Sequence, residues 1–202
     1  MSNQNKGKPF DVCFIDADSI IYRIAVTSST VAQGKKYYDK AIEDIEWDTS
    51  STEVKVAVKG KGNFRYDVAT DYKGQRISEA AKAKADPKVA TRRTALTKYA
   101  WSLGHHRSDN CEADDVVCIW AEEAKEAGVH YVIAHIDKDI DMMEGWHYNF
   151  TKKRLYYISE HEGFYFMCIQ MLTGDATDNI KGIKGIGPKK AEKLLADVPT
   201  GK

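Results

Sequence analysis

Residues 11–16 read DVCFID, a short apolar run that ends in an aspartate. A run of this length and composition predicts a buried β-strand. Residues 131–137, YVIAHID, repeat the pattern, so Asp16 and Asp137 both stand at the predicted carboxyl ends of strands. A third strand is predicted at 54–58, where the β-branched stretch VKVAV is followed by the turn-forming sequence GKGN.

Helical patterns separate these strands. Residues 112–127 place Val116, Ile119, Trp120 and Ala124 on one face, which is typical of an amphipathic helix. Further helices are predicted at 19–26, 78–103, 164–172 and 188–196, and further strands at 146–150 and 154–158. The alternation predicts an α/β fold, with a mostly parallel sheet flanked by helices. Functional sites of such sheets lie beyond the carboxyl ends of the strands.

Length and composition fit a globular protein of one domain, or of one domain with a small appendage. The chain has 202 residues, 43% of them hydrophobic, and no run approaches the roughly 18 apolar residues that a membrane helix needs. Residues 1–9 are polar, which predicts a flexible N-terminus and no secretory signal. We therefore expect a soluble, cytoplasmic monomer with no membrane partner. The four scattered cysteines predict neither a disulfide framework nor a cysteine zinc site.

Charge is unevenly distributed along a chain whose formal net charge is zero. Residues 73–107 contain nine Lys or Arg residues against two acidic ones, a net charge of +7, whereas the acidic residues concentrate elsewhere. Separate zones of this kind suit a protein that holds phosphates with one zone and metal ions with the other. A solvated basic helix face is the alternative interpretation.

Acidic residues form four clusters at predicted strand ends or helix starts. The clusters are Asp16 with Asp18, Glu112 with Asp114 and Asp115, Asp137 with Asp139 and Asp141, and Asp175 with Asp178. A single cluster is explained well enough by helix capping, and for Asp18 and Asp141 we expect capping or solvent exposure. Four clusters at matching positions instead predict a site for two hard divalent cations, Mg²⁺ or Mn²⁺, because grouped carboxylates repel one another without them.

A glycine-rich loop precedes the last predicted helix. Residues 182–190 read GIKGIGPKK, in which Gly185 and Gly187 allow tight turns and Pro188 starts a helix whose free N–H groups attract anions. The spacing resembles the helix-hairpin-helix class, which binds the DNA backbone without reading its sequence.

Together these motifs resemble the flap endonuclease and 5′–3′ exonuclease family, most closely its bacteriophage members and the 5′-nuclease domain of bacterial DNA polymerase I. The resemblance runs from IDADS (15–19) to AEKLL (191–195), in the order of the family's motifs. It implies a PIN-like core at 10–172 that includes a basic helical arch at about 71–110. It also implies a DNA-binding helix–three-turn–helix element at 173–202.

The resemblance also assigns roles to residues. Asp16, Glu112 and Asp114 would hold a first metal ion, with Asp115 close by, and Asp137, Asp139, Asp175 and Asp178 would hold a second. Lys73 and Arg76 would act on the scissile phosphate, and Tyr72 could stack on a terminal base. Further DNA contacts are expected from Arg92, Arg93, Gly185, Gly187, Lys189 and Lys190, and the glycine loop could also hold K⁺.

One departure concerns the first metal ion. The family usually has another aspartate just after the strand equivalent to 54–58, where this chain has Lys59 and Gly60, and Asp67 is too far along. Water or Asp18 would have to complete the site.

We expect a structure-specific 5′-nuclease that cuts DNA at a 5′ end, flap or single-strand/duplex junction. By analogy, an RNA primer–DNA hybrid is a further substrate, and a phage-encoded enzyme would act in the host cytoplasm. The alternatives are a non-catalytic binder of DNA structures, which the missing aspartate motivates, and a PIN-type ribonuclease.

Overall fold

The buried strand β1 (Val12–Asp16) lies at the centre of a six-stranded sheet in this computed structural model, which describes residues 9–69, 71–74 and 86–196. The sheet order is β3-β2-β1-β4-β5-β6. The other strands are β2 (Glu53–Lys59), β3 (His106–Ser108), β4 (Tyr131–His135), β5 (Gly145–Asn149) and β6 (Arg154–Ile158). All neighbouring strands pair in parallel except β5 and β6, which are antiparallel. The predicted α/β fold with a mostly parallel sheet is confirmed.

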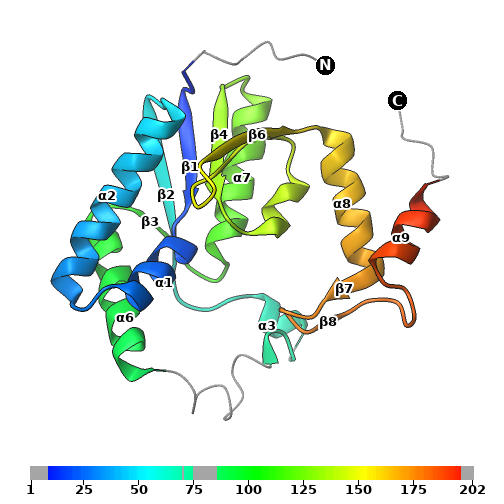
Figure 1. Ribbon diagram of the computed structural model, residues 1–202, viewed down its shortest axis with the longest axis horizontal. Coiled ribbons are helices and arrows are strands. Elements are labelled where there is room, and N and C mark those ends of the chain that lie inside the picture. Colours follow the sequence, from blue (N-terminus) through cyan, green and yellow to red (C-terminus); the bar gives the residue numbers. More distant parts are fainter. Residues whose placement is uncertain (1–8, 70, 75–85, 197–202) are drawn as a thin grey trace.

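Helices cover both faces of the sheet, because alternate residues of each strand point to opposite sides. Cys13 and Ile15 of β1 belong to one core cluster, and Val12 and Phe14 to the other. The helices are α1 (Asp18–Thr27), α2 (Val31–Thr49) and α6 (Pro87–Ser102) on the first face and α7 (Ala113–Glu126) on the second (Figure 1).

Helix α2 lies in the stretch 28–52, to which the sequence pattern assigns no element. Its buried residues are few and far apart: Gly34, Tyr38, Ile45 and Thr49. The helix is nevertheless well defined at both ends. The Thr30 side chain accepts a hydrogen bond from the backbone N–H of Gln33, and Ser50 closes the helix in a left-handed conformation with φ of 52°.

The C-terminal part lies beside the sheet (Figure 1). It comprises α8 (Glu160–Thr173), β7 (Gly174–Asp175), β8 (Ile180–Lys181) and α9 (Pro188–Leu195). The predicted apolar helix at 164–172 is present, but it is not a core helix, since Phe164 and Met171 are exposed. It packs against α9 and against the 3-10 helix η1 (Lys138–Met142). A further short helix among the described residues, α3 (Arg65–Val68), follows β2.

The residue range predicted for the arch, 71–110, is too long, because it includes helix α6. Helix α6 packs on α1, α2 and β2, and its residues Leu96 and Ala100 are fully buried. Of its basic side chains, those of Lys88, Arg93 and Lys98 are exposed on the outside of this core helix. Helix α6 begins at Pro87, and the Asp86 side chain caps it by accepting a hydrogen bond from the N–H of Lys88. Of the helix predicted at 78–103, residues 78–85 lie outside the described residues, as do 75–77.

The strand predicted at 131–137 ends earlier than expected. Strand β4 stops at His135, and Asp137 instead caps η1 by accepting a hydrogen bond from the N–H of Asp139. In the part of the chain that the structure describes, no helix is long and apolar enough to cross a membrane.

Candidate active site

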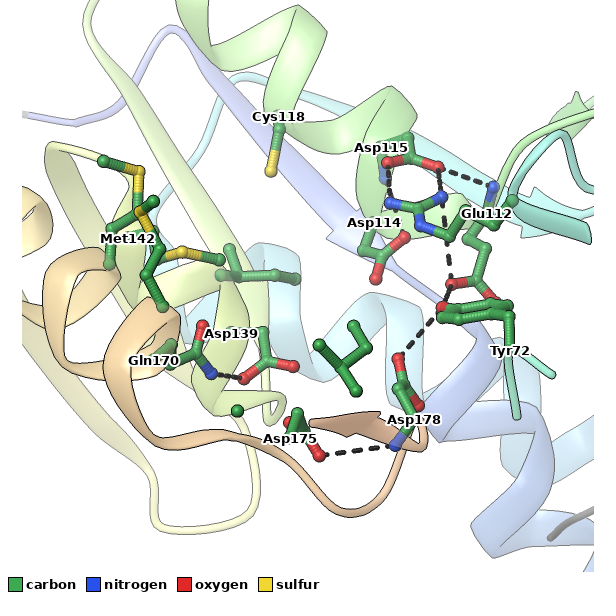
Figure 2. A pocket seen from close by; sticks show the side chains of 16 residues that line it. Tyr72, Glu112, Asp114, Asp115, Cys118, Asp139, Met142, Gln170, Asp175 and Asp178 are labelled. Carbon is green, nitrogen blue, oxygen red and sulfur yellow. Dashed lines mark hydrogen bonds and ion pairs between the residues drawn. The ribbon is translucent and has the colours of Figure 1, made fainter. Parts of the chain in front are cut away.

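Two adjoining cavities open at the carboxyl ends of β1 and β4. The first, of about 350 Å³, is lined by residues that include Asp16, Asp18 and Asp137. The second, of about 340 Å³, is lined by residues that include Asp115, Asp139, Asp175 and Asp178 (Figure 2). Glu112 and Asp114 line both cavities. The structure thus brings all eight predicted metal-binding residues to one place.

The end of β1 positions the deepest carboxylates. Asp16 is the last residue of the strand and is 6% exposed. Its Oδ1 accepts a hydrogen bond from the backbone N–H of Asp18, and Asp18 Oδ1 accepts one from the N–H of Lys59 at 2.9 Å. The expectation of a cap or an exposed side chain is therefore wrong for Asp18. Its carboxylate bridges the ends of β1 and β2 and faces the first cavity.

The start of α7 holds three more acidic residues in fixed orientations. Glu112 and Asp115 form a capping box, in which each side chain accepts a hydrogen bond from the other's backbone N–H. Asp115 also receives both guanidinium arms of Arg65, each at 2.6 Å. The bidentate pair directs Asp115 toward Arg65, whereas Asp114 lies beside both cavities.

Lys73 and Tyr72 reach into the centre of the acidic cluster from the first residues of the predicted arch. The Lys73 ammonium lies 2.6 Å from Glu112 Oε1 and 3.7 Å from Asp178 Oδ2. The Tyr72 hydroxyl lies 2.7 Å from Glu112 Oε2 and 2.9 Å from Asp178 Oδ2 (Figure 2). Tyr72 is only 4% exposed, so its ring is buried rather than presented to a terminal base.

The η1 turn and the segment after α8 supply the rest of the cluster. Asp175 Oδ1 accepts hydrogen bonds from the N–H groups of Thr177 and Asp178, which folds the turn around it. Asp139 accepts a hydrogen bond from the Gln170 amide of α8. The Lys138 ammonium lies 3.4 Å from Asp175 and 3.7 Å from Asp139, so it bridges the two segments.

Seven carboxylates of the site divide into two groups by the direction of their pKa shifts. Burial, followed by the charges of neighbouring carboxylates, raises the pKa of Asp16 well above its usual value and that of Asp114 to about 6. Burial also raises the pKa of Asp18 and Asp139. In the second group, Glu112, Asp115 and Asp175, burial also raises the pKa, but hydrogen bonds and nearby positive charges lower it by more. The pKa is therefore lowered for Glu112 by Lys73, for Asp115 by Arg65 and for Asp175 by the Thr177 N–H and Lys138.

The residues fit divalent metal ions by their chemistry. The site offers carboxylate oxygens, the donors that Mg²⁺ and Mn²⁺ prefer. Several of these carboxylates lie so close together that burial and mutual repulsion raise the pKa of Asp16 and Asp114. The ammonium groups of Lys73 and Lys138 already bridge pairs of these carboxylates, as a cation would.

At residue 60 there is no room for the expected carboxylate. A Cβ on Gly60 would lie 2.5 Å from the carbonyl oxygen of Ser108 and 2.4 Å from Asp109 Oδ1. Asp67 is exposed on α3 and does not line the described cavities. Asp18 is the carboxylate that the structure places on this side of the first cavity.

The predicted DNA-contacting residues are not all gathered at the site. Arg93 lines the first cavity, but the Arg92 guanidinium donates a hydrogen bond to the carbonyl of Ala25 and so ties α6 to α1. Arg76 lies outside the described residues. Gly185 and Gly187 lie in the loop before α9, where Gly185 has a φ of +82° that favours glycine. Gly187 is the N-cap of α9, Lys189 is exposed, and the Lys190 ammonium donates to the carbonyl of Gly185 at 2.8 Å.

Sequence reasoning missed three residues that orient the cluster: Arg65, Lys138 and Gln170. Arg65 contacts Asp115, which is 50 positions away, and Gln170 contacts Asp139, which is 31 positions away. Neither Arg65 nor Gln170 lies in a recognisable motif. Lys138 stands inside the acidic DKD motif, and this position is the one signal that could have identified it.

Comparison with known proteins identifies the family to which the sequence is similar. A family model described as the 5′-3′ exonuclease, N-terminal resolvase-like domain, matches residues 11–143. DNA polymerase I of Bacillus caldotenax is 26% identical over 209 residues, which cover 92% of this chain and 23% of the polymerase. The thermostable DNA polymerase I of Thermus aquaticus is 31% identical over 146 residues, which cover 67% of this chain and 17% of the polymerase. The chain thus spans less than a quarter of the length of these relatives.

A solved structure confirms the fold. A flap endonuclease of bacteriophage T5, in a pseudo-enzyme–product complex with DNA and metal ions, matches with a TM-score of 0.76 at 19% identity. The match covers 92% of this chain and 74% of that chain, and it confirms the predicted PIN-like arrangement of the sheet and its helices. Because the family model covers more than half of the sequence, the chain belongs to the family of 5′-3′ exonuclease N-terminal resolvase-like domains.

Proposed function

We propose that this chain is a divalent-metal-dependent 5′-nuclease, a 5′–3′ exonuclease or flap endonuclease that hydrolyses DNA phosphodiesters. The observation that carries the proposal is the convergence of acidic side chains from β1, α7, η1 and the segment after α8 on two adjoining cavities. A protein that only bound DNA would gain nothing from grouping carboxylates beside a polyanion, since the two repel each other.

Two groups of carboxylates would hold two Mg²⁺ or Mn²⁺ ions. We assign Asp16, Glu112 and Asp114 to the first ion, with Asp18 in place of the carboxylate that cannot fit at Gly60, and with Asp115 orienting Glu112 through the capping box. We assign Asp137, Asp139, Asp175 and Asp178 to the second. When bound, such ions would supply an activated water and neutralise charge on the scissile phosphate.

Lys73 is the cationic side chain best placed to act on that phosphate. Its ammonium is held by Glu112 and Asp178, and it becomes available for a phosphate oxygen when cations take over those carboxylates. Arg76 is proposed to assist it, and Arg93 stands at the same cavity. Tyr72 is proposed to position Glu112 and Asp178 through its hydroxyl rather than to stack on a base.

The glycine loop is proposed to hold the duplex backbone. The N-terminus of α9 has no side-chain cap, so the backbone N–H of Lys189 is proposed to donate to a phosphate oxygen, and the Lys189 side chain is exposed beside it. Lys190 holds the Gly185 carbonyl. If K⁺ binds this loop, it would compete for the same carbonyl. The packing of α8 against α9 across this loop supports a helix–three-turn–helix element, and it moves the proposed start of that element from residue 173 to the start of α8.

The test is a panel of 5′-labelled substrates incubated with the protein and Mg²⁺ or Mn²⁺. The panel contains a 5′-flap DNA, a nicked duplex, a blunt duplex, an RNA primer–DNA hybrid and a matched RNA flap. We expect cleavage of the flap and the nicked duplex that EDTA abolishes. Binding of the flap without cleavage would establish the non-catalytic alternative, and preferential cutting of the RNA flap would establish the ribonuclease.

A further inference from the structure

Two histidines and an aspartate that line neither of the two acidic cavities lie close together. His135 ends β4, Asp141 lies in η1, and His147 lies in the middle of β5. His135 Nε2 is 2.7 Å from His147 Nδ1, and these two nitrogens lie 3.7 Å and 4.0 Å from Asp141 Oδ1. Both rings are fully buried, whereas Asp141 is half-buried rather than an exposed cap as the sequence predicts.

The hydrogen bonds of the two rings leave two lone pairs facing each other. His135 Nδ1 lies 2.7 Å from the carbonyl oxygen of Asp137, and His147 Nε2 lies 2.9 Å from the carbonyl oxygen of Met143. A carbonyl only accepts, so each of these nitrogens carries its ring's proton. In neutral rings the remaining nitrogens, 2.7 Å apart, are then both acceptors with no hydrogen between them. The arrangement requires a shared proton or a cation.

The surroundings of the group match those of a metal site. Metal-binding histidines usually donate their other N–H to a backbone carbonyl or carboxylate, which fixes the tautomer and the orientation of the ring. Both rings do so here. The third side chain is held as well, because the Tyr156 hydroxyl donates to Asp141 Oδ1 at 2.7 Å, and the Tyr156 ring stacks on His147.

Access to the group is open on one side. A cavity of about 450 Å³ is lined by His135, Asp141 and Tyr156 among others. An ion could enter from this cavity and keep a water molecule there as its fourth ligand.

We propose that His135, Asp141 and His147 form a binding site for one zinc-class transition-metal ion, separate from the acidic cluster. Two imidazole nitrogens and one carboxylate suit Zn²⁺ or Co²⁺ rather than Mg²⁺, and the site uses no cysteine. Nitrogens bound about 2.05 Å from a tetrahedral ion lie roughly 3.3 Å apart, so binding widens the gap between the rings by roughly 0.6 Å.

The ion would act on the nuclease site through the backbone. Its three ligands come from β4, η1 and β5, and η1 carries Asp139 while Asp137 caps it. His135 also holds the carbonyl of Asp137. An ion at this site would therefore fix the turn that presents two of the proposed carboxylates for the second catalytic ion. It is a positioning site and contacts no substrate.

Metal content and cobalt spectra test the proposal without any cleavage assay. Protein dialysed against Mg²⁺ with a trace of Zn²⁺ is expected to retain one equivalent of Zn²⁺ by elemental analysis. Replacement by Co²⁺ should give the intense visible absorption of a tetrahedral site with nitrogen ligands, whereas Co²⁺ on oxygen ligands in the acidic cluster absorbs weakly. The affinity for Zn²⁺ should fall at least about 100-fold in His147→Gln and in Asp141→Asn, and should be unchanged in Asp175→Asn.

Two outcomes would overturn the proposal. One is that the wild-type protein retains no Zn²⁺. The two rings would then share a proton, and the Asp141 carboxylate would neutralise its charge. The other is Zn²⁺ retention that Asp175→Asn abolishes and Asp141→Asn does not, which would place the ion in the acidic cluster. Asp141 is only half-buried, so Asp141→Asn decides the question even if His147→Gln does not fold.

Discussion

The Lys73 ammonium lies 2.6 Å from Glu112 Oε1, inside the acidic cluster. The same ammonium is 3.7 Å from Asp178 Oδ2, and the Lys73 backbone N–H donates to the Asp178 carbonyl at 3.0 Å. Glu112 and Asp178 belong to the carboxylate groups proposed for different metal ions. Lys73 therefore stands between the two proposed ion sites and neutralises part of the negative charge of their carboxylates.

Replacing Lys73 by methionine should change metal binding and catalysis in opposite directions. Without the ammonium, Glu112 and Asp178 lose a competing cation, so Mn²⁺ should bind about 10-fold more tightly by electron paramagnetic resonance titration. Cleavage under single-turnover conditions should slow by about 10²-fold or more, because a cation is lost from the phosphate. Weaker Mn²⁺ binding in Lys73→Met would mean that the ammonium helps to assemble the metal sites and does not compete with the ions.

Removing the Tyr72 hydroxyl should destabilise the metal-free protein. The hydroxyl separates Glu112 from Asp178 and hydrogen-bonds to them in a buried position, so Tyr72→Phe should lower the free energy of unfolding by about 2 kcal/mol. Saturating Mg²⁺ should shrink this difference, because cations then neutralise both carboxylates. Urea unfolding followed by tryptophan fluorescence measures both values, with Tyr22→Phe on the surface as the control. A deficit that Mg²⁺ leaves unchanged would show that the hydroxyl acts only in packing.

Asp114→Asn should stabilise the metal-free protein at high pH only. The pKa of Asp114 is raised from 3.8 to about 6 in the folded state, so between these values the unfolded chain ionises first and the free energy of unfolding falls as pH rises. The loss is complete above pH 6. We expect Asp114→Asn to recover about 1 to 2 kcal/mol at pH 8 and almost nothing near pH 4. Equal effects at the two pH values would contradict the raised pKa.

Saturating Mg²⁺ at pH 8 should reverse the order of stability. The wild type gains from binding an ion that Asp114→Asn binds weakly, so it should become the more stable protein. Thermal unfolding with and without Mg²⁺ measures the change.

Restoring the family's aspartate at residue 60 should harm the protein. The Cβ of Gly60→Asp would meet the backbone carbonyl of Ser108 at 2.5 Å, so β2 and β3 would have to separate. We expect a loss of about 1 to 3 kcal/mol in stability, as for other overpacked sites, and no gain in Mn²⁺ affinity. Gly60→Ala should show most of the same loss, which separates crowding from charge. Tighter Mn²⁺ binding in Gly60→Asp would show that Asp18 does not complete the first site.

The sequence predicted the parts of this molecule that depend on local pattern. The apolar run at 11–16 and the β-branched run at 54–58 became neighbouring parallel strands, and the capping residues at 112–115 began a helix at the predicted place. The acidic clusters met at one end of the sheet because parallel strands end at the same edge.

Features that depend on long-range packing could not be predicted in this way. The pairing of Arg65 with Asp115 joins residues 50 positions apart, and no motif marks Arg65. The few buried residues of helix α2 are separated by charged residues, so its sequence shows no clear helical pattern. Helix α6 was assigned to a basic arch because most of its basic side chains are exposed, although Leu96 and Ala100 are buried in the core. The crowding at Gly60 arises from Ser108 on a different strand.

The central claim is that the acidic cluster binds the ions that cut DNA. Single-turnover cleavage of a 5′-labelled flap DNA in Mg²⁺ tests it most directly, with wild type, Asp178→Asn and Asp44→Asn compared. Asp44 pairs with Lys40 on the surface of α2, so its variant controls for the loss of one charge. We predict that wild type and Asp44→Asn cut at equal rates and that Asp178→Asn is slower by about 10³-fold or more. Equal rates in all three proteins, or no cleavage by the folded wild type, would contradict the account.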